Sequence, residues 1–452
     1  MLEKFFKLSE NGTDVKTEVL AGVTTFMTMA YILAVNPGIM AAAGMDQGAV
    51  FTATALASLI GTLLMAFFAN YPFALAPGMG LNAYFAYTVV LGMGYSWQVA
   101  LTAVFAEGII FIVLSLTNVR EAIFNAIPIQ LKKGVSVGIG LFIAFIGFQN
   151  AGIVVNSDST LVTVINFTAN FHTAGISALL AVIGTFIISV MYIKGIKGSI
   201  LIGIFITWIL GIICQLTGLY TVTPEAGYYS LIPSWNGFSL SSIGLTFGQC
   251  FKGDFSSIKI IDFIVIILAF LFVDIFDTLG TLIGCANKAN MLDKEGKLPR
   301  IKQALLADAI ATSAGAVLGT STTTTFVESS SGVAEGGRTG LASVVTAFLF
   351  LISIFFAPIF TTIPSFATAP ALLFVGFLMI TAITQIDFNN LTEAIPTYLC
   401  LLAMPLLYSI SEGIAVGVIS YVVINAVCGK AKKITPLMYI LAILFICKYI
   451  FL

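Results

Sequence analysis

The residues best suited to chemistry in this 452-residue chain are carboxylic acids placed in long apolar runs. The acids within or at the edge of such runs are Glu107, Asp274, Asp277, Asp308, Glu328 and Glu412. No Lys or Arg lies in the interior of a full-length run. A charged side chain at the bilayer centre costs at least ~2.5 kcal/mol, and desolvation disfavours the ionised form of a carboxyl group. Acids without basic partners therefore favour the binding of H⁺ or Na⁺ together with a neutral, hydrogen-bonding solute, and they disfavour an anion carrier.

The densest group of these acids lies in the segment 273–281, which reads VDIFDTLGT. Asp274, Asp277 or Thr278, and Thr281 recur at the spacing of one helical face. Such a polar stripe indicates either a binding site or a structural seam between helices, and the pattern leaves both interpretations open.

The other acids in full helices are weaker candidates for function. Glu107 and Asp308 are single acids in otherwise apolar runs, where a bond to a neighbour's hydroxyl or backbone is the commoner explanation. Glu412 is expected at the turn between two short helices, where it would cap the turn.

Two further segments are too irregular to be plain membrane helices. In 73–84, Pro77, Gly78 and Gly80 interrupt the helix and Asn82 follows at once. In 319–332, β-branched residues favour an extended start, after which Glu328 and three serines open a short helix.

These irregular segments occupy matching places in two halves of seven membrane segments each. An odd number per half gives the halves opposite orientations, so they are predicted to be inverted repeats. Paired interruptions at corresponding positions of inverted halves are the best sequence indication of a transporter's binding site. Irregular backbone is tolerated at membrane depth only where protein buries it or a watery cavity meets it. The alternative is that Gly and Pro are simply commoner in membrane helices.

The amino-acid composition indicates that these residues are positioned by membrane-spanning helices. Of the chain, 59% is hydrophobic and only 9% is charged, against about 25% charged in a soluble domain. The 20 basic and 21 acidic residues nearly cancel, which excludes a nucleic-acid binder. The chain is therefore predicted to be an all-α polytopic membrane protein, and no partner of the nucleic-acid class is expected.

Runs of roughly 20 apolar residues, the length that spans the hydrocarbon, fix the predicted segments. They lie near 19–36, 49–69, 98–116, 134–151, 174–193, 198–217, 260–284, 304–319, 340–359 and 369–386, with a shorter pair at 396–411 and 413–428. With the irregular segments at 73–90 and 321–335, the total is fourteen. The apolar tail at 436–452 either spans the membrane or lies on its surface.

The basic residues orient the segments by the positive-inside rule. With the N-terminus in the cytoplasm, all Lys and Arg residues except Lys252, Lys259 and Lys448 fall in cytoplasmic segments. A wrong span count would have scattered them. The expected location is the cell membrane, as a multi-pass protein.

Enzyme signatures are lacking in the sequence. It shows no His/Cys/Asp cluster at metal spacing and no nucleotide-binding loop, so no metal, cofactor or catalytic residue is expected. The glycine-rich stretch 336–340 (GGRTG) lacks the Lys-Ser/Thr that would follow in a phosphate loop.

Four motifs together resemble one known family, the AzgA-like purine permeases, a branch of the nucleobase:cation symporters related to the uracil and xanthine permeases. The motifs are 22–37 (GVTTFMTMAYILAVNP), 76–83 (APGMGLNA), 273–280 (VDIFDTLG) and 325–333 (TFVESSSGV) followed by GGRTG. The resemblance covers essentially the whole chain.

The resemblance implies the uracil-permease fold, with fourteen segments in two inverted repeats of seven and short extended stretches in broken segments 3 and 10. After a cytoplasmic N-terminus at 1–18, it implies a core domain from 19–117 and 251–360. It implies a gate domain from 118–250 and 361–452, the latter including the apolar tail. A homodimer is implied only by analogy with the fold.

The resemblance also implies the site and the substrate. Asn82, Asp274 and Glu328 would line the site, with Asp277 close by and Gly80 and Phe326 on the same broken segments. The substrate would be a purine base such as guanine, hypoxanthine or adenine, taken up with H⁺. The repulsion of unpaired acids, independently of the resemblance, predicts Asp274 as the main group for the coupling ion, with Asp277 and Glu328 as the other candidates.

The chemistry of a purine agrees with such a site. A carboxylate accepts two N–H bonds from one edge of a base, Asn82 both donates and accepts, and Phe326 or Tyr84 could stack on the ring or simply pack. A passive channel or facilitator, an intramembrane enzyme, Na⁺ coupling and another neutral heterocycle remain as alternatives. The sequence leaves the preferred purine, the oligomeric state and the choice of H⁺ or Na⁺ open.

Overall fold

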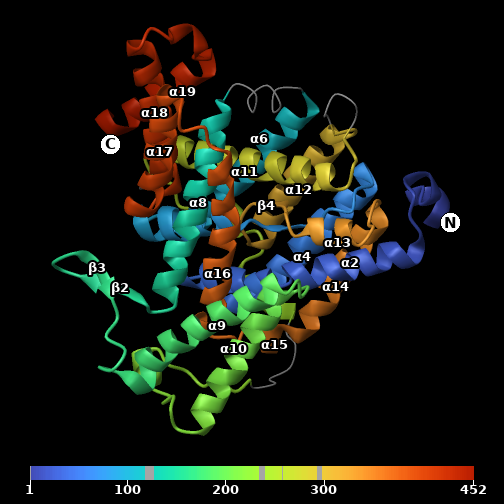
Figure 1. Cartoon of the computed structure of the whole chain (residues 1–452), viewed down its shortest axis with the longest axis vertical. Coiled ribbons are helices and arrows are strands. Elements are labelled where there is room, and N and C mark those ends of the chain that lie inside the picture. The colour runs from blue at the N-terminus through green and yellow to red at the C-terminus, as the bar shows by residue number, and fades with distance from the viewer. Residues whose placement is uncertain (1, 118–126, 234–239, 257, 293–297, 452) are drawn as a thin grey trace.

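The computed structural model describes residues 2–117, 127–233, 240–256, 258–292 and 298–451 (Figure 1). Within them, ten helical stretches are long and apolar enough to cross a membrane. The long helices are α2 (Val15–Met29), α3 (Ile32–Ala42), α4 (Gln47–Leu64), α6 (Trp97–Leu116), α8 (Ile129–Asn150), α9 (Ile176–Ile193), α10 (Ser199–Leu216), α11 (Ile260–Lys288), α12 (Ile301–Leu318), α14 (Gly340–Ser353), α16 (Ser365–Ile380), α17 (Leu391–Leu406), α18 (Ile410–Val427) and α19 (Pro436–Phe451). A mostly helical membrane protein, as predicted, is confirmed.

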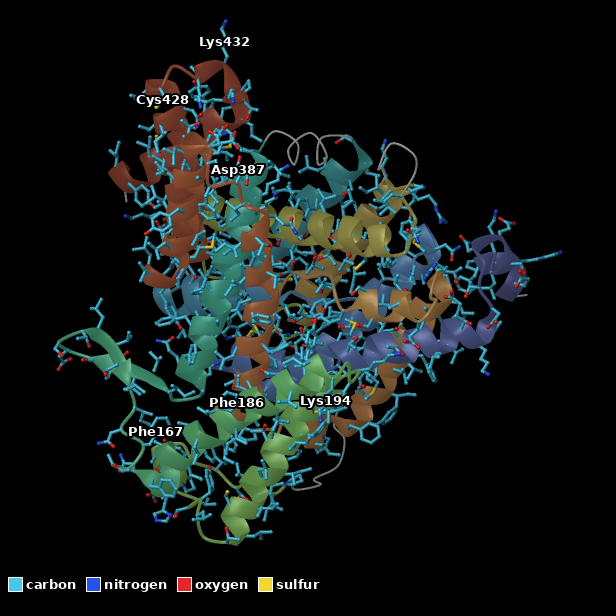
Figure 2. The ribbon with its side chains drawn as sticks, in the orientation of Figure 1. Phe167, Phe186, Lys194, Asp387, Cys428 and Lys432 are labelled. Carbon is cyan, nitrogen blue, oxygen red and sulfur yellow. The ribbon has the colours of Figure 1, made fainter. Side chains whose placement is uncertain are left out.

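Several of the long helices begin at polar caps, and apolar side chains are exposed on their outer faces. Asp46 and Ser96 accept hydrogen bonds from the backbone N–H groups of Ala49 and Val99, as N-cap residues do. Phe186 on α9 is 65% exposed (Figure 2). Exposed apolar side chains on helices of this length suit contact with lipid.

The helices form two packing groups. One group contains α2, α3, α4, α6, α12 and α14, together with the short helix α13 (Ser329–Ala334). The other contains α8, α9, α10, α16, α17 and α18. Helix α11 packs against α6 of the first group and also touches α8 and α18 of the second. In Figure 1 the first group lies on the side of the N-terminus and the second on the side of the C-terminus.

Close helix packing in the first group depends on glycine. A Cβ atom added at Gly22 on α2 would lie 2.4 Å from the backbone oxygen of Ala342 on α14. One added at Gly108 on α6 would lie 2.8 Å from the backbone nitrogen of Ser313 on α12. Gly22 opens the motif 22–37, so close packing of α2 against α14 explains the glycine at this position of the motif.

The two irregular segments meet at the centre of the first group. Strand β1 (Leu75–Pro77) pairs with β4 (Thr323–Thr325) in antiparallel register, with Ala76 opposite Thr324. The short helix α5 (Met79–Ala83) and a π-helical stretch (Tyr84–Gly92) follow β1, and α13 follows β4. The short extended stretches predicted in both broken segments, and the short helix predicted after the second, are therefore confirmed.

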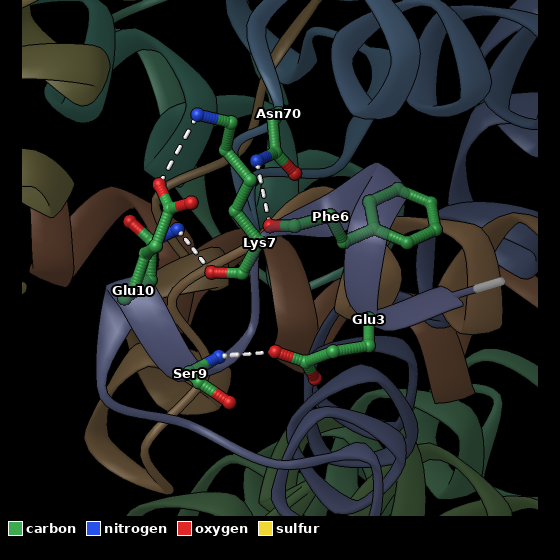
Figure 3. Close-up of polar contacts among 7 residues, drawn as sticks. Glu3, Phe6, Lys7, Ser9, Glu10 and Asn70 are labelled. Atoms are coloured by element: carbon green, nitrogen blue, oxygen red, sulfur yellow. Dashed lines mark hydrogen bonds and ion pairs between the residues drawn. The ribbon is translucent and has the colours of Figure 1, made fainter.

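The N-terminal segment is tied to the first group by polar contacts (Figure 3). Asn70 Nδ2 donates to the Phe6 backbone oxygen at 2.9 Å, and its Oδ1 accepts from Gly340 N at 2.8 Å. Within the segment, Ser9 N donates to Glu3 Oε1 at 2.9 Å. The hydrogen bonds from Ser9 hold the pKa of Glu3 below its usual range.

Two details differ from the predicted elements near the C-terminus. The pair predicted at 396–411 and 413–428 lies at Leu391–Leu406 and Ile410–Val427, because the turn falls at 407–409. Ser409 caps α18 by accepting from Glu412 N at 3.3 Å. Glu412 therefore lies in the first turn of α18 instead of capping the turn, and its carboxylate accepts a hydrogen bond from Tyr449 on α19.

A hairpin between two of the predicted spans projects from the second group. Strands β2 (Val154–Ser157) and β3 (Leu161–Val164) pair antiparallel and extend away from the helices in Figure 1. Leu161, which opens β3, has a left-handed φ of 66° and is 86% exposed.

Candidate functional site

A cavity of about 760 Å³ lies between the two packing groups. From the first group and α11 it is lined chiefly by Thr28, Tyr31, Gly78, Gly80, Asp277, Thr281, Phe326 and Glu328. From the second group it is lined by residues of α8, the α9–α10 loop, α16 and the short helix Thr381–Gln385. Small-molecule sites have volumes of about 300–1,000 Å³, so the cavity suits a small solute.

Two carboxyl groups line this cavity. Asp277 reaches it from α11, and Gly78 at the end of β1 lies against it, since a Cβ added there would be 3.5 Å from Asp277 Oδ2. Glu328 reaches it from the turn between β4 and α13. The sequence analysis named both as ion-coupling candidates, and the structure brings both to one cavity.

Glu328 is held from the junction of α2 and α3. Tyr31 Oη donates to Glu328 Oε1 at 2.7 Å, and Thr28 Oγ1 lies 3.4 Å from the Glu328 backbone oxygen. Among the described residues, no hydrogen bond is recorded to Glu328 Oε2. The cavity-lining carboxylate therefore has one oxygen engaged by protein and one available to a ligand.

Gly80 and Phe326 also line the cavity. Gly80 lies against α8, where an added Cβ would be 2.7 Å from Ile139 Cγ2. Phe326 is 6% exposed, and its backbone N–H donates to Ala74 O at 2.9 Å. The residue therefore sits on a backbone fixed by the strand pair and adds an apolar side chain to the cavity wall.

Asn82 and Asp274 lie outside the cavity lining. Both are completely buried. The Asn82 carboxamide accepts a hydrogen bond from Ser321 and donates to Pro77 O at 3.3 Å. Asp274 Oδ1 accepts from Thr278 Oγ1 at 2.8 Å. In this conformation neither side chain contacts the cavity directly, so direct substrate binding by either stays a prediction.

A run of hydroxyl residues, 320–325, connects the acids behind the cavity. Thr322 Oγ1 donates to Glu107 Oε2 at 2.7 Å. Thr278 Oγ1 lies 3.1 Å from Asp308 Oδ1 and 2.6 Å from Thr324 Oγ1. The expectation that Glu107 and Asp308 bond a neighbour's hydroxyl is confirmed.

The sequence analysis missed the contributions of Tyr31 and Thr28 to this site. Both lie in the motif 22–37, which it used only as a family signature. A signal was present, because Thr28 and Tyr31 are three residues apart and therefore share one helical face. It also passed over Lys197, which lines the cavity at the α9–α10 loop and forms an ion pair with Glu335 at the end of α13.

Backbone N–H groups in and beside the glycine-rich stretch 336–340 bind a carboxylate of the chain itself. Glu18 on α2 is completely buried and accepts from Arg338 N at 2.7 Å and from Ala342 N at 3.0 Å. The backbone donors that could have cradled a phosphate therefore bind Glu18. Within the described ranges, no group of three or more His, Cys, Asp or Glu side chains could hold a metal ion.

A second cavity of about 820 Å³ lies toward the other end of α8. Its lining includes Gln149, Asn150 and Ala34, and it contains neither Asp277 nor Glu328. The first cavity contacts α8 near its start, at Ser136 and Ile139. The two cavities therefore lie between the same packing groups but toward opposite ends of α8.

A multi-pass helical protein with cavities between two helix groups, one of them lined by carboxyl groups, has the form of a membrane transporter. Comparison with known proteins makes the class specific. Residues 16–416 match the xanthine/uracil permease model, described as "Permease family". The chain belongs to this permease family and is a transporter, not an enzyme, which confirms the AzgA-like resemblance.

Relatives and a solved structure agree with this assignment over most of the chain. Guanine/hypoxanthine permease PbuG of Bacillus subtilis is 45% identical, with all of both chains covered. Adenine permease AdeP of Escherichia coli is 41% identical, covering all of this chain and 96% of AdeP. The transmembrane domain of a cyanobacterium bicarbonate transporter, BicA, superposes with a TM-score of 0.60 at 16% identity, covering 89% of this chain and 97% of BicA's. The likeness to BicA shows the fold alone.

Proposed function

We propose that this protein is a secondary-active transporter of the cell membrane that imports purine nucleobases, guanine, hypoxanthine or adenine, together with H⁺. The observation that carries the proposal is the cavity between the helix groups, with Glu328, Asp277 and Phe326 on one wall. The names of relatives 45% and 41% identical over the whole chain supply the substrate class.

The cavity chemistry suits a flat, neutral heterocycle. Glu328 Oε2 would accept an N–H of the base, as acidic side chains do in base recognition, and Phe326 would pack against a ring face. Lys197, the basic residue among the described lining residues, is neutralised by Glu335. The cavity therefore gives no reason to prefer an anion over a neutral base.

The transport cycle would alternate access between the two helix groups. In the proposed topology the irregular segments are the third and tenth of fourteen, in two inverted repeats of seven. The groups correspond to a core (19–117 and 251–360) and a gate (118–250 and 361–452). With the N-terminus cytoplasmic, the α9–α10 loop that lines the Glu328 cavity is also cytoplasmic. This conformation would then face inward, and the second cavity would be the outer vestibule.

Proton coupling would use the acids on both sides of β4. Two ionised carboxylates that share one cavity without a nearby unpaired cation would repel each other, so at least one group takes a proton when substrate is bound. We propose Asp274 as the main proton-linked group and Asp277 as the second. Asp274 contacts Thr278, which contacts Thr324 of β4, and β4 leads directly to Phe326 and Glu328. A change of charge at Asp274 would therefore be transmitted through hydrogen bonds to β4, and along the chain from β4 to the cavity-lining residues Phe326 and Glu328.

Uptake of labelled hypoxanthine into proteoliposomes tests the proposal. An imposed inward proton gradient should drive accumulation above equilibrium, a protonophore should abolish it, and replacement of Na⁺ should not matter. Unlabelled guanine and adenine should compete, and uracil should compete poorly. Equilibration unaffected by the protonophore would establish a passive facilitator, dependence on Na⁺ would replace H⁺ as the coupling ion, and absence of any purine uptake would refute the function.

A further inference from the structure

Tyr31 is the side chain of the cavity wall whose role the proposed function leaves open. It lies in the two-residue gap between α2, which ends at Met29, and α3, which begins at Ile32. The residue is 1% exposed and lines the cavity. Its hydroxyl therefore lies at the wall, while its ring is enclosed by protein.

The geometry points to a single partner for that hydroxyl. Tyr31 Oη is 2.7 Å from Glu328 Oε1, within the range for a hydrogen bond to a charged acceptor. Thr28, one turn earlier, contacts the backbone oxygen of the same glutamate. The α2–α3 junction therefore holds both the carboxylate and the backbone of Glu328.

We propose that Tyr31 is the positioning residue of the substrate-binding Glu328 and acts on purine affinity through it. This inference rests on the proposed function. The phenol fixes the carboxylate rotamer by binding Oε1, so Oε2 is presented to the cavity as an acceptor in one orientation. The donated hydrogen bond also stabilises the ionised carboxylate, which is the form that accepts an N–H from a base. A ligand without an N–H donor gains nothing from this arrangement.

A tyrosine remote from the cavity serves as a matched control. Tyr398 on α17 is 49% exposed and lines neither cavity. Tyr398→Phe therefore makes the same chemical change without removing a bond to a carboxylate and without altering the cavity wall.

A double-mutant cycle on the purified full chain tests the inference, with equilibrium binding of radiolabelled hypoxanthine as the readout. Tyr31→Phe should weaken binding by about tenfold or more, the effect of one lost hydrogen bond to a charged group. In a Glu328→Gln background the same change should alter affinity by less than about twofold, because the residue it acts through is already neutral. Tyr398→Phe should bind like the wild type.

The outcomes separate this inference from the proposed function. Absence of hypoxanthine binding by the wild type would refute the proposed function. Wild-type binding with an unaffected Tyr31→Phe variant, or with equal losses in both backgrounds, would overturn the role of Tyr31 alone. If Tyr31→Phe does not fold, 3-fluorotyrosine introduced at position 31 keeps the shape and donates more strongly. It should change hypoxanthine affinity where Glu328 is present and leave the Glu328→Gln variant unchanged, and an unmoved affinity in both backgrounds would likewise overturn the inference.

Discussion

Glu328→Gln is the most informative single change to the proposed site, because the structure separates its local effect from its effect on substrate. The glutamine has nearly the shape of the glutamate, and its carbonyl oxygen can still accept the hydrogen bond from Tyr31 that is 2.7 Å long in the structure. The amide NH₂ then takes the place of Oε2. A donor now faces the N–H of the base, so an attractive contact becomes a repulsive one.

The expected loss follows from that geometry. A hydrogen bond to a charged group contributes about 1.5–3 kcal/mol, which corresponds to a roughly 10- to 150-fold change in the dissociation constant. We expect the upper part of this range for guanine and hypoxanthine, because the amide removes the acceptor and also adds an opposing donor. Thermal stability should change little, since the Tyr31 bond survives.

Equilibrium binding of labelled hypoxanthine to purified protein, with thermal unfolding measured in parallel, is the assay. Glu225→Gln is the matched control, because Glu225 is exposed on the loop 218–233 and does not line either cavity. A Glu328→Gln protein that is folded and binds hypoxanthine within about threefold of the wild type would refute the reasoning, since that factor is less than 1 kcal/mol. Glu328 would then not be a substrate ligand.

Other changes test the coupling group, the scaffold and the helix packing. Asp274→Asn mimics the protonated acid, and the variant should lose uphill, pH-driven uptake more completely than it loses purine binding. Accumulation that still follows an imposed proton gradient would move the coupling role to Asp277 or Glu328. Asn82→Ala removes the acceptor of the Ser321 hydroxyl and should lower the free energy of unfolding by about 1–3 kcal/mol as well as weaken binding. Thermal unfolding and a binding titration measure the two effects, and an unchanged melting temperature would contradict the buried contact. Gly22→Val should lower the free energy of unfolding by about 1–3 kcal/mol, because the added side chain overpacks against α14. Denaturation in detergent measures this effect, and a wild-type denaturation midpoint would contradict the close approach of α2 to α14.

Local sequence signals were sufficient to predict the irregular segments. Pro77 fixes its own φ and lacks an N–H, and four consecutive threonines at 322–325 favour extended backbone. The structure pairs these stretches as β1 and β4. The hairpin β2–β3 had a comparable signal, because β-branched residues flank the polar stretch 156–160. The hairpin was not predicted, because its two strands of four residues each are short beside the long apolar spans on either side.

The placement of the acids on α11 could not be predicted from spacing. Asp274 and Asp277 are three residues apart, which is a rotation of only about 60° on an α-helix. The periodicity therefore assigns both to one polar face. The edge between packed surface and cavity falls between them, because α11 packs against α6 and β4 on one side and approaches α8 on the other. The position of that edge depends on helix packing, which a single helix does not encode.

The contact of Tyr31 with Glu328 was beyond sequence reasoning for a related reason. The two residues are 297 positions apart, and a tyrosine in an apolar motif usually indicates packing. Only the strand pair, which positions the start of α13 beside α2, makes the contact necessary. The same pairing positions Phe326 at the cavity wall.

The hydroxyl run 320–325 accounts for the division of the acids into two sets. Thr322 bonds Glu107, and Thr324 contacts Thr278, which contacts both Asp274 and Asp308. These acids are thereby held behind β4, where hydroxyl groups compensate for their burial. The run ends at Thr325, three residues before Glu328, and the two acids that line the cavity are Glu328 and Asp277. In the proposed cycle, proton binding behind β4 and substrate binding in front of it therefore act on the same three-residue strand.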